Sequence, residues 1–178
     1  GAFGAAEILG WIPANGGAIT RIETANGRGA PHFVQGDDRI YLFHGQKGLV
    51  SIRWDGTDEK EHLKVTGITT FPALADEQNC MLVETATEPQ RRPSSASLIL
   101  KAPVGDQALA KINNEIYVVT IPMVGGTTPS ISVAKAENAI FPSRELTTLG
   151  GEWPQWSSNG RPLYWSLGNA YFDYYLDA

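Results

Sequence analysis

The sequence of 178 residues is poor in the residues that build metal and redox sites, since it contains one cysteine, Cys80, and three histidines. A lone thiol excludes an intramolecular disulfide and a zinc site built on cysteines. The apolar residues that follow it, 81–83, predict a buried structural thiol. No apolar run approaches the roughly 18 residues that a membrane-spanning helix needs, so no membrane span is predicted.

Charged residues make up 19% of the chain, and neither sign is concentrated in one region. Lysine and arginine together number 14 against 19 aspartates and glutamates, which gives a formal net charge of -5. The basic residues do not cluster, apart from the adjacent pair Arg91 and Arg92. Nucleic-acid binding needs a concentrated basic face, so no nucleic-acid partner is predicted.

Glycine and proline are abundant instead, with 19 and 11 residues. They fall between short strand-like runs and not in one low-complexity block, a pattern typical of an all-β protein with many tight turns. No segment keeps apolar residues at helical spacing for long, and only residues 131–139 are expected to form a short helical turn. The length is sufficient for one domain with its own core.

One pattern occurs three times, in residues 30–43, 71–83 and 153–165. In each copy a proline is followed two positions later by a large apolar residue, then by a polar turn, and at nine positions by the aliphatic or Met residue of a strand. The prolines are Pro31, Pro72 and Pro154, and the strand residues are Ile40, Met81 and Leu163. Successive prolines are 41 and 82 residues apart. A period of about 40–45 residues built from short strands is the signature of β-propeller blades.

The repeat predicts an all-β fold, a β-propeller or partial propeller of about 3–4 four-stranded antiparallel blades, in a single domain over residues 1–178. The blades are expected at residues 7–24 (partial), 27–67, 69–149 (with insertions) and 152–178 (partial). Since propellers usually have about four to eight blades, we interpret the chain as a fragment of a longer protein. Its start, Gly-Ala-Phe without a methionine, is interpreted as a processed or excised segment.

Glycine and proline also predict where strands end within the blades. The outer strand at residues 62–66 is expected to end at Gly67. Residues 88–95 contain Pro89 and Pro93, which interrupt a ladder of backbone hydrogen bonds, so this segment is expected to be an exposed loop.

Four segments carry a resemblance to a known family. Residues 62–67, 113–118 and 151–157 resemble TolB-like propeller repeats. Residues 165–173 resemble the end of the propeller that precedes a metal-dependent amidohydrolase barrel in large, usually exported, bacterial proteins. The resemblance implies a periplasmic or extracellular location and a parent protein of the amidohydrolase family. The family's metal ligands and catalytic aspartate lie in the barrel, beyond residue 178, so the resemblance implies a fold and a context but no catalytic residue here.

The three histidines, His32, His44 and His62, have no His-x-His or His-Glu-x-x-His spacing. His32 is predicted on the inner strand of a blade, His44 at the end of its second strand and His62 at the start of its outer strand. We therefore expect them to be spread across the blade as surface or hydrogen-bonded residues, with no metal or other cofactor. A propeller lyase with a His-ligated manganese ion stays an alternative.

Carboxylates and hydroxyls are interpreted as turn residues. Side chains of aspartate cap backbone N–H groups in turns, and five are predicted there: Asp37, Asp38, Asp55, Asp58 and Asp76. None of them follows the calcium-loop pattern. Ser157 lies outside any Gly-x-Ser-x-Gly motif and is expected to cap a turn instead of attacking a substrate. A glycosidase with two facing carboxylates stays an alternative.

Aromatic side chains are abundant for this length, and they gather near the end of the chain: Trp11, Trp54, Trp153, Trp156, Trp165, Tyr171, Phe172, Tyr174 and Tyr175. We interpret them as packing between blades, and the alternative is a stacking platform for sugars or a peptide. Trp156 and Trp165 are expected to be largely buried. One of Tyr174 and Tyr175 is expected to be exposed, because side chains alternate along a strand.

The sequence thus predicts a non-catalytic TolB-like propeller module, the scaffold or the substrate-gating or interaction domain of a larger amidohydrolase-related protein. An autonomous propeller that binds a peptide or a carbohydrate is the first alternative, and a propeller lyase or glycosidase is the second. The expected partners are a downstream catalytic domain or another protein, and a second copy of the chain through exposed blade edges.

Overall fold

The computed structural model describes residues 9–22, 28–71, 90–123, 125–134 and 141–176. These ranges contain strands and no helix, which confirms the predicted all-β class. They hold no helix long and apolar enough to cross a membrane. The strands are β1 (Gly10–Trp11), β2 (Thr20–Arg21), β3 (Arg28–His32), β4 (Ile40–His44), β5 (Gly48–Ile52), β6 (Lys60–Phe71), β7 (Gln90–Ser95), β8 (Leu98–Lys101), β9 (Gln107–Ile112), β10 (Glu115–Thr120), β11 (Ser130–Ser132), β12 (Ser143–Glu145), β13 (Glu152–Trp156), β14 (Pro162–Leu167) and β15 (Ala170–Tyr175).

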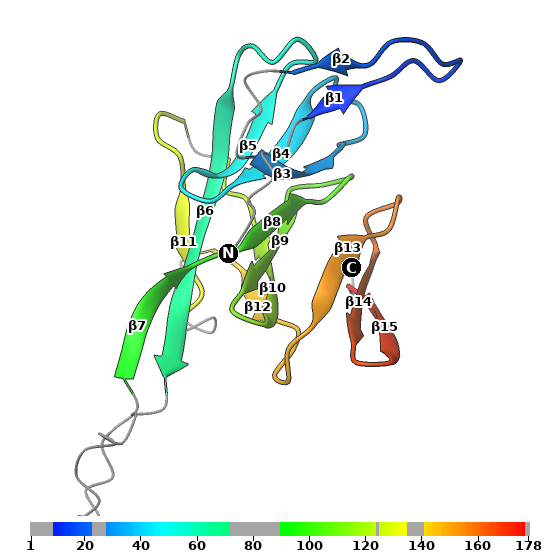
Figure 1. The fold of residues 1–178 in the computed structure, drawn as a ribbon. Helices are drawn as coiled ribbons and strands as arrows, with labels where there is room; N and C mark the ends of the chain where they lie inside the picture. Colours follow the sequence, from blue (N-terminus) through cyan, green and yellow to red (C-terminus); the bar gives the residue numbers. More distant parts are fainter. Residues whose placement is uncertain (1–8, 23–27, 72–89, 124, 135–140, 177–178) are drawn as a thin grey trace, which may run out of the picture.

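Three of the sheets are meanders in which each strand pairs with the next along the chain, except that β10 pairs with β12 instead of β11 (Figure 1). The first sheet runs β3-β4-β5-β6, the second β8-β9-β10-β12 and the third β13-β14-β15. Two further strands join β6, β7 antiparallel and β11 parallel. A separate hairpin pairs β1 with β2. None of the described sheets closes on itself.

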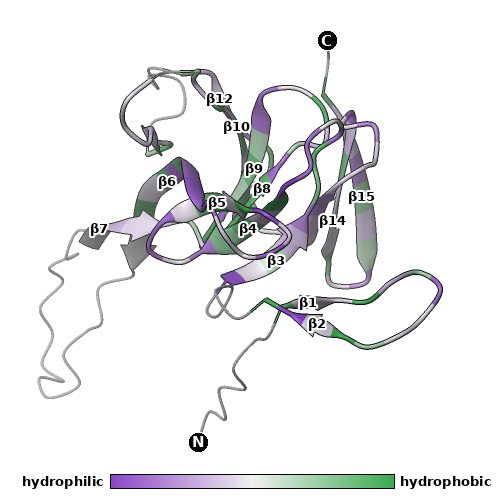
Figure 2. Cartoon of the chain, turned by 90° about the horizontal axis from the view of Figure 1, so that it is seen from above, coloured by the Kyte–Doolittle hydropathy of each residue, from purple (hydrophilic) through white to green (hydrophobic). Residues whose placement is uncertain are grey.

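Apolar side chains on both faces of the second sheet bind the three meanders together. Along β10, Val119 and its neighbour Tyr117 face the first sheet, whereas Ile116 and Val118 face the third. This is the alternation of a strand covered on both sides, and it explains why the sequence of β10 is almost continuously apolar. In Figure 2 the hydrophobic colour concentrates on β8 and β9, between the first sheet and β14–β15.

The first sheet is covered on its other face by the N-terminal hairpin. Leu9 and Ile22, which flank β1 and β2, pack on a buried cluster of Ile40, Leu42, Val50 and Ile52. No described segment covers the outward face of the third sheet in this way, and Tyr171 and Tyr175 are exposed there.

The first and last copies of the repeated pattern occupy equivalent places in their sheets. Pro31 lies in β3 and Pro154 in β13, the first strands of the first and third sheets. Ile40 and Leu163, nine positions later, are both buried in the second strands. The middle copy, residues 71–83, lies outside the described residues apart from Phe71.

Three local predictions are wrong. β6 does not end at Gly67 but continues to Phe71, because the missing side chain leaves room for Ile112, whose Cδ1 would lie 3.1 Å from an added Cβ. Residues 90–95 form the edge strand β7, where Pro93 is tolerated because only one side of an edge strand is paired. Residues 130–132 form β11, parallel to β6, in place of the start of a helical turn.

Candidate functional site: a pocket between three sheets

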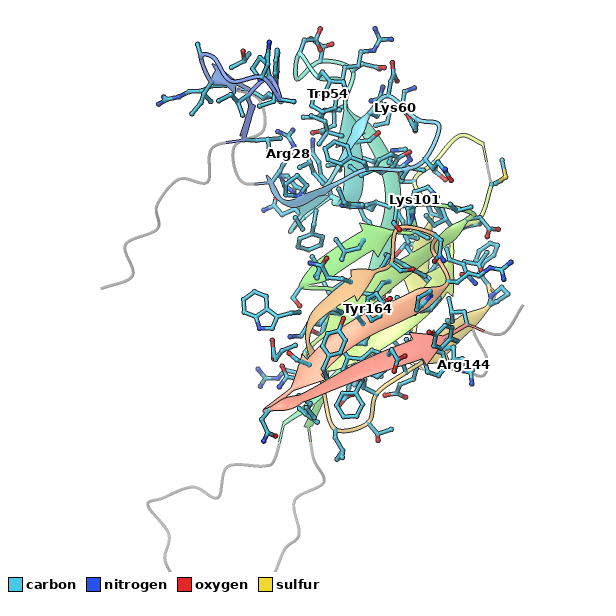
Figure 3. All side chains as sticks on the ribbon, turned by 90° about the vertical axis from the view of Figure 1, so that its right-hand side faces the viewer. Arg28, Trp54, Lys60, Lys101, Arg144 and Tyr164 are labelled. Atoms are coloured by element: carbon cyan, nitrogen blue, oxygen red, sulfur yellow. The ribbon has the colours of Figure 1, made fainter. Side chains whose placement is uncertain are left out.

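An apolar hollow lies where the first strands of the three sheets approach one another. This inter-sheet pocket has a volume of about 490 Å³ and is lined by residues of β3, β8 and β13 and the turns that follow them. Figure 3 shows Lys101, the last residue of β8, at the boundary between the first sheet and the third. The residues that give its walls their apolar and aromatic character are Pro31, Phe33, Leu100, Trp153, Pro154 and Trp156.

A β-bulge aims Trp153 at the rim of this pocket. The register of β13 against β14 shifts between Glu152 and Gln155, and Trp153 has φ of +54°. Left-handed backbone disfavours a residue with a Cβ, and the position before a proline is restricted further. The side chain nevertheless stays 80% exposed. The chain therefore keeps a strained conformation that presents a large aromatic ring to solvent.

The same bulge occurs in β3. Its register against β4 shifts between Gly29 and His32, and Ala30 has φ of +52° directly before Pro31. Pocket walls on two sheets thus have the same backbone geometry. The residue with the left-handed backbone is Ala30 in β3 and Trp153 in β13. The two copies of the repeat therefore share the bulge geometry, and only Trp153 adds an aromatic ring to it.

His32 joins the first sheet to the second at the base of the pocket. Its Nε2 accepts a hydrogen bond from the backbone N–H of Lys101 at 2.9 Å, so Nδ1 carries the proton and donates to the carbonyl of Ala30 at 2.8 Å. Burial lowers the pKa of His32, which favours this neutral form. With both ring nitrogens engaged, His32 is the hydrogen-bonded histidine that the sequence predicted and has no lone pair left for a metal.

Trp156 joins the second sheet to the third in the same manner. Its Nε1 donates to the carbonyl of Leu100 at 3.0 Å, and its ring is half-buried. On the opposite wall, Phe33 stacks on Trp54 with ring centroids 5.6 Å apart, and both rings are exposed. The pocket therefore has a fixed ring, Trp156, and exposed rings at its edges.

Several polar side chains in the pocket already make a hydrogen bond within the protein. The Lys101 ammonium donates to the carbonyl of Gly105 at 2.7 Å. The Ser157 hydroxyl donates to the side chain of Asn159 in the same turn at 2.7 Å. Gln155 and Ser158 remain exposed without a side-chain partner among the described residues. The pocket is consequently apolar with two adaptable polar groups at its edge.

A serine–histidine pair in the first sheet has the distance of a nucleophile and its base, but it is structural. The Ser51 hydroxyl lies 2.7 Å from His62 Nε2 and accepts from Arg39 Nε at 2.8 Å. Ser51 is completely buried, so no substrate reaches it. Burial lowers the pKa of His62 to about 4, and the Arg39 charge acts in the same direction.

The predicted turn aspartates are held by their own turns. Asp55 accepts from the Thr57 N–H and hydroxyl, and Asp37 accepts from the Arg39 N–H and the Tyr41 hydroxyl. Asp58 instead pairs with the Arg39 guanidinium at 2.8 Å, and this hydrogen bond holds the pKa of its carboxyl below the usual value. Asp76 lies outside the described residues. Within the described ranges no three His, Cys, Asp or Glu side chains are grouped to hold a metal ion.

The interpretation of the aromatic residues as packing is correct for part of the set. Trp165 is buried, as expected, and Tyr174 packs beside it while Tyr175 is exposed. Trp156 is half-buried instead of largely buried. The packing interpretation is wrong for the residues with side chains at the surface: Trp11, Trp54, Trp153, Tyr171, Phe172 and Tyr175.

The pocket brings together residues that lie far apart in the sequence, and only some of them carry a sequence signal. The repeated proline, with its large apolar residue two positions later, is the signal that places Phe33 and Trp156 at equivalent positions on two walls. Lys101 and Pro103 on the third wall have no such signal. Comparison with protein-family models, with curated proteins and with solved structures finds no match to this chain.

Proposed function

We propose that this chain is a TolB-like β-propeller module that binds a ligand in the inter-sheet pocket and does no chemistry on it. The proposal is supported by the meander order of the three sheets, whose first strands all line the pocket. The observation that carries it is Trp153, held in a strained backbone conformation and exposed at the rim. Strain of this kind is retained where function requires it.

An extended, proline-rich or otherwise apolar peptide is the ligand that this pocket fits best. Proline-rich segments adopt an extended helix without internal hydrogen bonds and dock in aromatic-lined grooves. Trp153, Trp156 and Phe33 provide such rings from two sheets. Gln155 at the edge supplies an amide that pairs with a peptide group.

A carbohydrate is the second candidate, since exposed aromatic rings also stack on sugars. A sugar presents many hydroxyl groups, and each buried hydroxyl without a partner costs binding free energy. Gln155 and Ser158 make no side-chain hydrogen bond among the described residues, whereas His32, Lys101 and Ser157 each already make at least one. The polar inventory therefore favours the peptide.

The same inventory supports the non-catalytic part of the proposal. His32 has both nitrogens engaged and the Ser51–His62 pair is inaccessible. In a periplasmic or extracellular protein with an amidohydrolase barrel, the pocket would serve as a docking or substrate-gating site beside the catalytic domain. This context is part of the proposal and depends on the resemblance alone.

Binding is tested by calorimetric titration of the purified chain with a decaproline peptide, with a random-sequence peptide array identifying better sequences. We expect a dissociation constant below about 1 mM for the peptide class. Trp153→Ala should weaken it at least tenfold, whereas the matched variant Trp11→Ala, which removes an exposed tryptophan on the N-terminal hairpin, should not. Equal binding by both variants would place the site elsewhere.

An oligosaccharide series, such as chitohexaose and maltohexaose, provides the second arm. Sugar binding that Trp153→Ala removes, in the absence of peptide binding, would replace the peptide by the carbohydrate. Absence of binding to every probe would refute the binding function.

A further inference from the structure

Among the described sheet edges, that of β15 is the least protected against pairing with another strand, since a single charge, Asp173, is its only protective feature. Natural proteins protect edges with short strands, prolines, bulges, charges or covering side chains. β3 and β13 have bulges and the prolines Pro31 and Pro154, β7 has Pro93, and the side chains of His32 and Trp156 cover β8. β1, β2, β11 and β12 are two or three residues long. β15 is six residues long without proline, lysine or arginine, Asp173 is its only charged residue, and among the described strands only β14 pairs with it.

The backbone groups available on that edge follow from the register. The Pro162 carbonyl accepts from the Ser157 N–H, so the backbone of Pro162 faces away from β15. Tyr175 lies opposite Pro162, and its own N–H and carbonyl therefore point to the open side. The hydrogen-bonding direction alternates along a strand, so the N–H and carbonyl groups of Tyr171 and Asp173 point there as well.

We propose that β15 pairs antiparallel with β15 of a second copy of this chain and forms a two-fold symmetric dimer. The strand reads Tyr-Phe-Asp-Tyr-Tyr over residues 171–175, aromatic on both sides of Asp173. Reversing it places aromatic residues against aromatic residues again. A two-fold interface requires this self-complementarity. Pairing with a strand from an unrelated protein would not require it.

The charge of Asp173 selects the register of the dimer. A two-fold axis perpendicular to the sheet keeps each face on its own side, so only registers that differ by two residues are possible. The central register sets Asp173 against Asp173 of the second copy, and like charges directly opposite are destabilising. The two adjacent registers set Asp173 against Tyr171 or Tyr175 of the second copy. The tyrosine hydroxyls can then approach the carboxylate as donors.

The exposed face of the third sheet is consistent with a protein partner. Tyr171 is 70% exposed and Tyr175 64% exposed, and in Figure 3 Tyr164 lies on this same sheet. The rings of Tyr164 and Tyr171 stack on each other with centroids 5.7 Å apart, which covers one face of each ring. Tyrosine is enriched in protein interfaces, and edge pairing extends this row across two copies.

The test compares two pairs of variants by sedimentation and light scattering at tens of micromolar protein. Asp173→Pro removes an outward N–H that the chain's own sheet does not use, which proline tolerates on an edge, and Asp173→Asn keeps that N–H. Tyr171→Asp/Tyr175→Asp places a carboxylate opposite Asp173 in either adjacent register, and Tyr171→Asn/Tyr175→Asn is its uncharged control.

We expect the parent and both Asn controls to be dimers, with the Pro variant and the double Asp variant dissociating at least tenfold more readily. If Asp173→Pro fails to fold by circular dichroism, the double Asp variant still decides. A monomeric parent, or a dimer that survives the double Asp substitution, would overturn the proposal. It does not depend on the proposed binding function, because the open edge and the pocket lie on different strands.

Discussion

Replacing Trp153 by glycine and by alanine tests whether the bulge at the pocket is strained for the sake of an exposed ring. Trp153 combines φ of +54° with a position before Pro154 and with 80% exposure. In ordinary strand positions alanine is more stable than glycine by about 0.5–1 kcal/mol. At Trp153 we expect the opposite order.

The size of the effect follows from three contributions. A tryptophan buries about 150–250 Å² when fully buried, so losing the one-fifth that is covered here costs about 1 kcal/mol in both variants. Alanine keeps the left-handed strain of about 1–2 kcal/mol, which glycine relieves. Glycine adds about 0.5–1 kcal/mol of unfolded-chain entropy. The glycine variant should therefore be more stable than the alanine variant by about 0.5–1 kcal/mol.

Urea unfolding followed by circular dichroism measures the difference without relying on tryptophan fluorescence. The control pair is Gln155→Gly and Gln155→Ala, on the same exposed strand without a positive φ, where alanine should be the more stable. Ala30→Gly, at the equivalent bulge of β3, should not destabilise the chain. If alanine exceeds glycine at Trp153 by the same margin as at Gln155, the backbone is not strained and the main support for the pocket as a binding site is lost.

Two further changes test the packing and the buried network. Gly151→Ala should destabilise the chain by about 1–3 kcal/mol in thermal or urea unfolding, because an added Cβ would lie 2.5 Å from Ile116 Cδ1. The control Gly125→Ala, where an added Cβ meets nothing within 4 Å, should change the free energy of unfolding by less than about 0.5 kcal/mol. Acid should destabilise the fold between pH 6.5 and about 4, because folding lowers the pKa of His62 and the unfolded state binds the proton first. After allowance for solvent screening this amounts to about 1–2 kcal/mol, and His62→Gln should flatten the pH profile while His44→Gln should not.

The strands of the second and third sheets were predictable because their sequences contain the necessary physical signals. β10 is an almost uninterrupted apolar run, and Asn113 begins the turn before it with φ of +56°, a conformation that asparagine tolerates. The two described copies of the proline pattern identified β3 and β13 as equivalent strands. These signals are local, so a single sequence is sufficient to recognise them.

The errors come from contacts between residues far apart in the chain. Gly67 looks like the end of a strand, and only Ile112, packed against it, shows why β6 continues. Pro93 is incompatible with a central strand but not with the edge that β7 occupies. Exposure of Trp153 was unpredictable for the same reason, because it depends on the bulge in β13, which the sequence does not reveal.

The pocket and the open edge follow from one property of a meander sheet, which always leaves its first and last strands half paired. The first strands of the three sheets, β3, β8 and β13, are protected by bulges, prolines and side chains. His32 and Trp156, for example, form hydrogen bonds with backbone groups of β8. What remains between those strands is a surface of side chains, suited to an apolar ligand. At the outer edge of the third sheet the backbone N–H and carbonyl groups of β15 stay unpaired among the described strands.

The affinity of a peptide for the pocket should therefore depend on aromatic residues such as Trp153 and should tolerate changes to the backbone amides of the peptide. The affinity of a strand for β15 should instead depend on the backbone amides of that strand. Decaproline cannot test this difference, because proline has no backbone N–H to methylate. A pocket-binding peptide from the array can be N-methylated instead. A large loss of affinity on N-methylation would show that the pocket also binds by adding a strand.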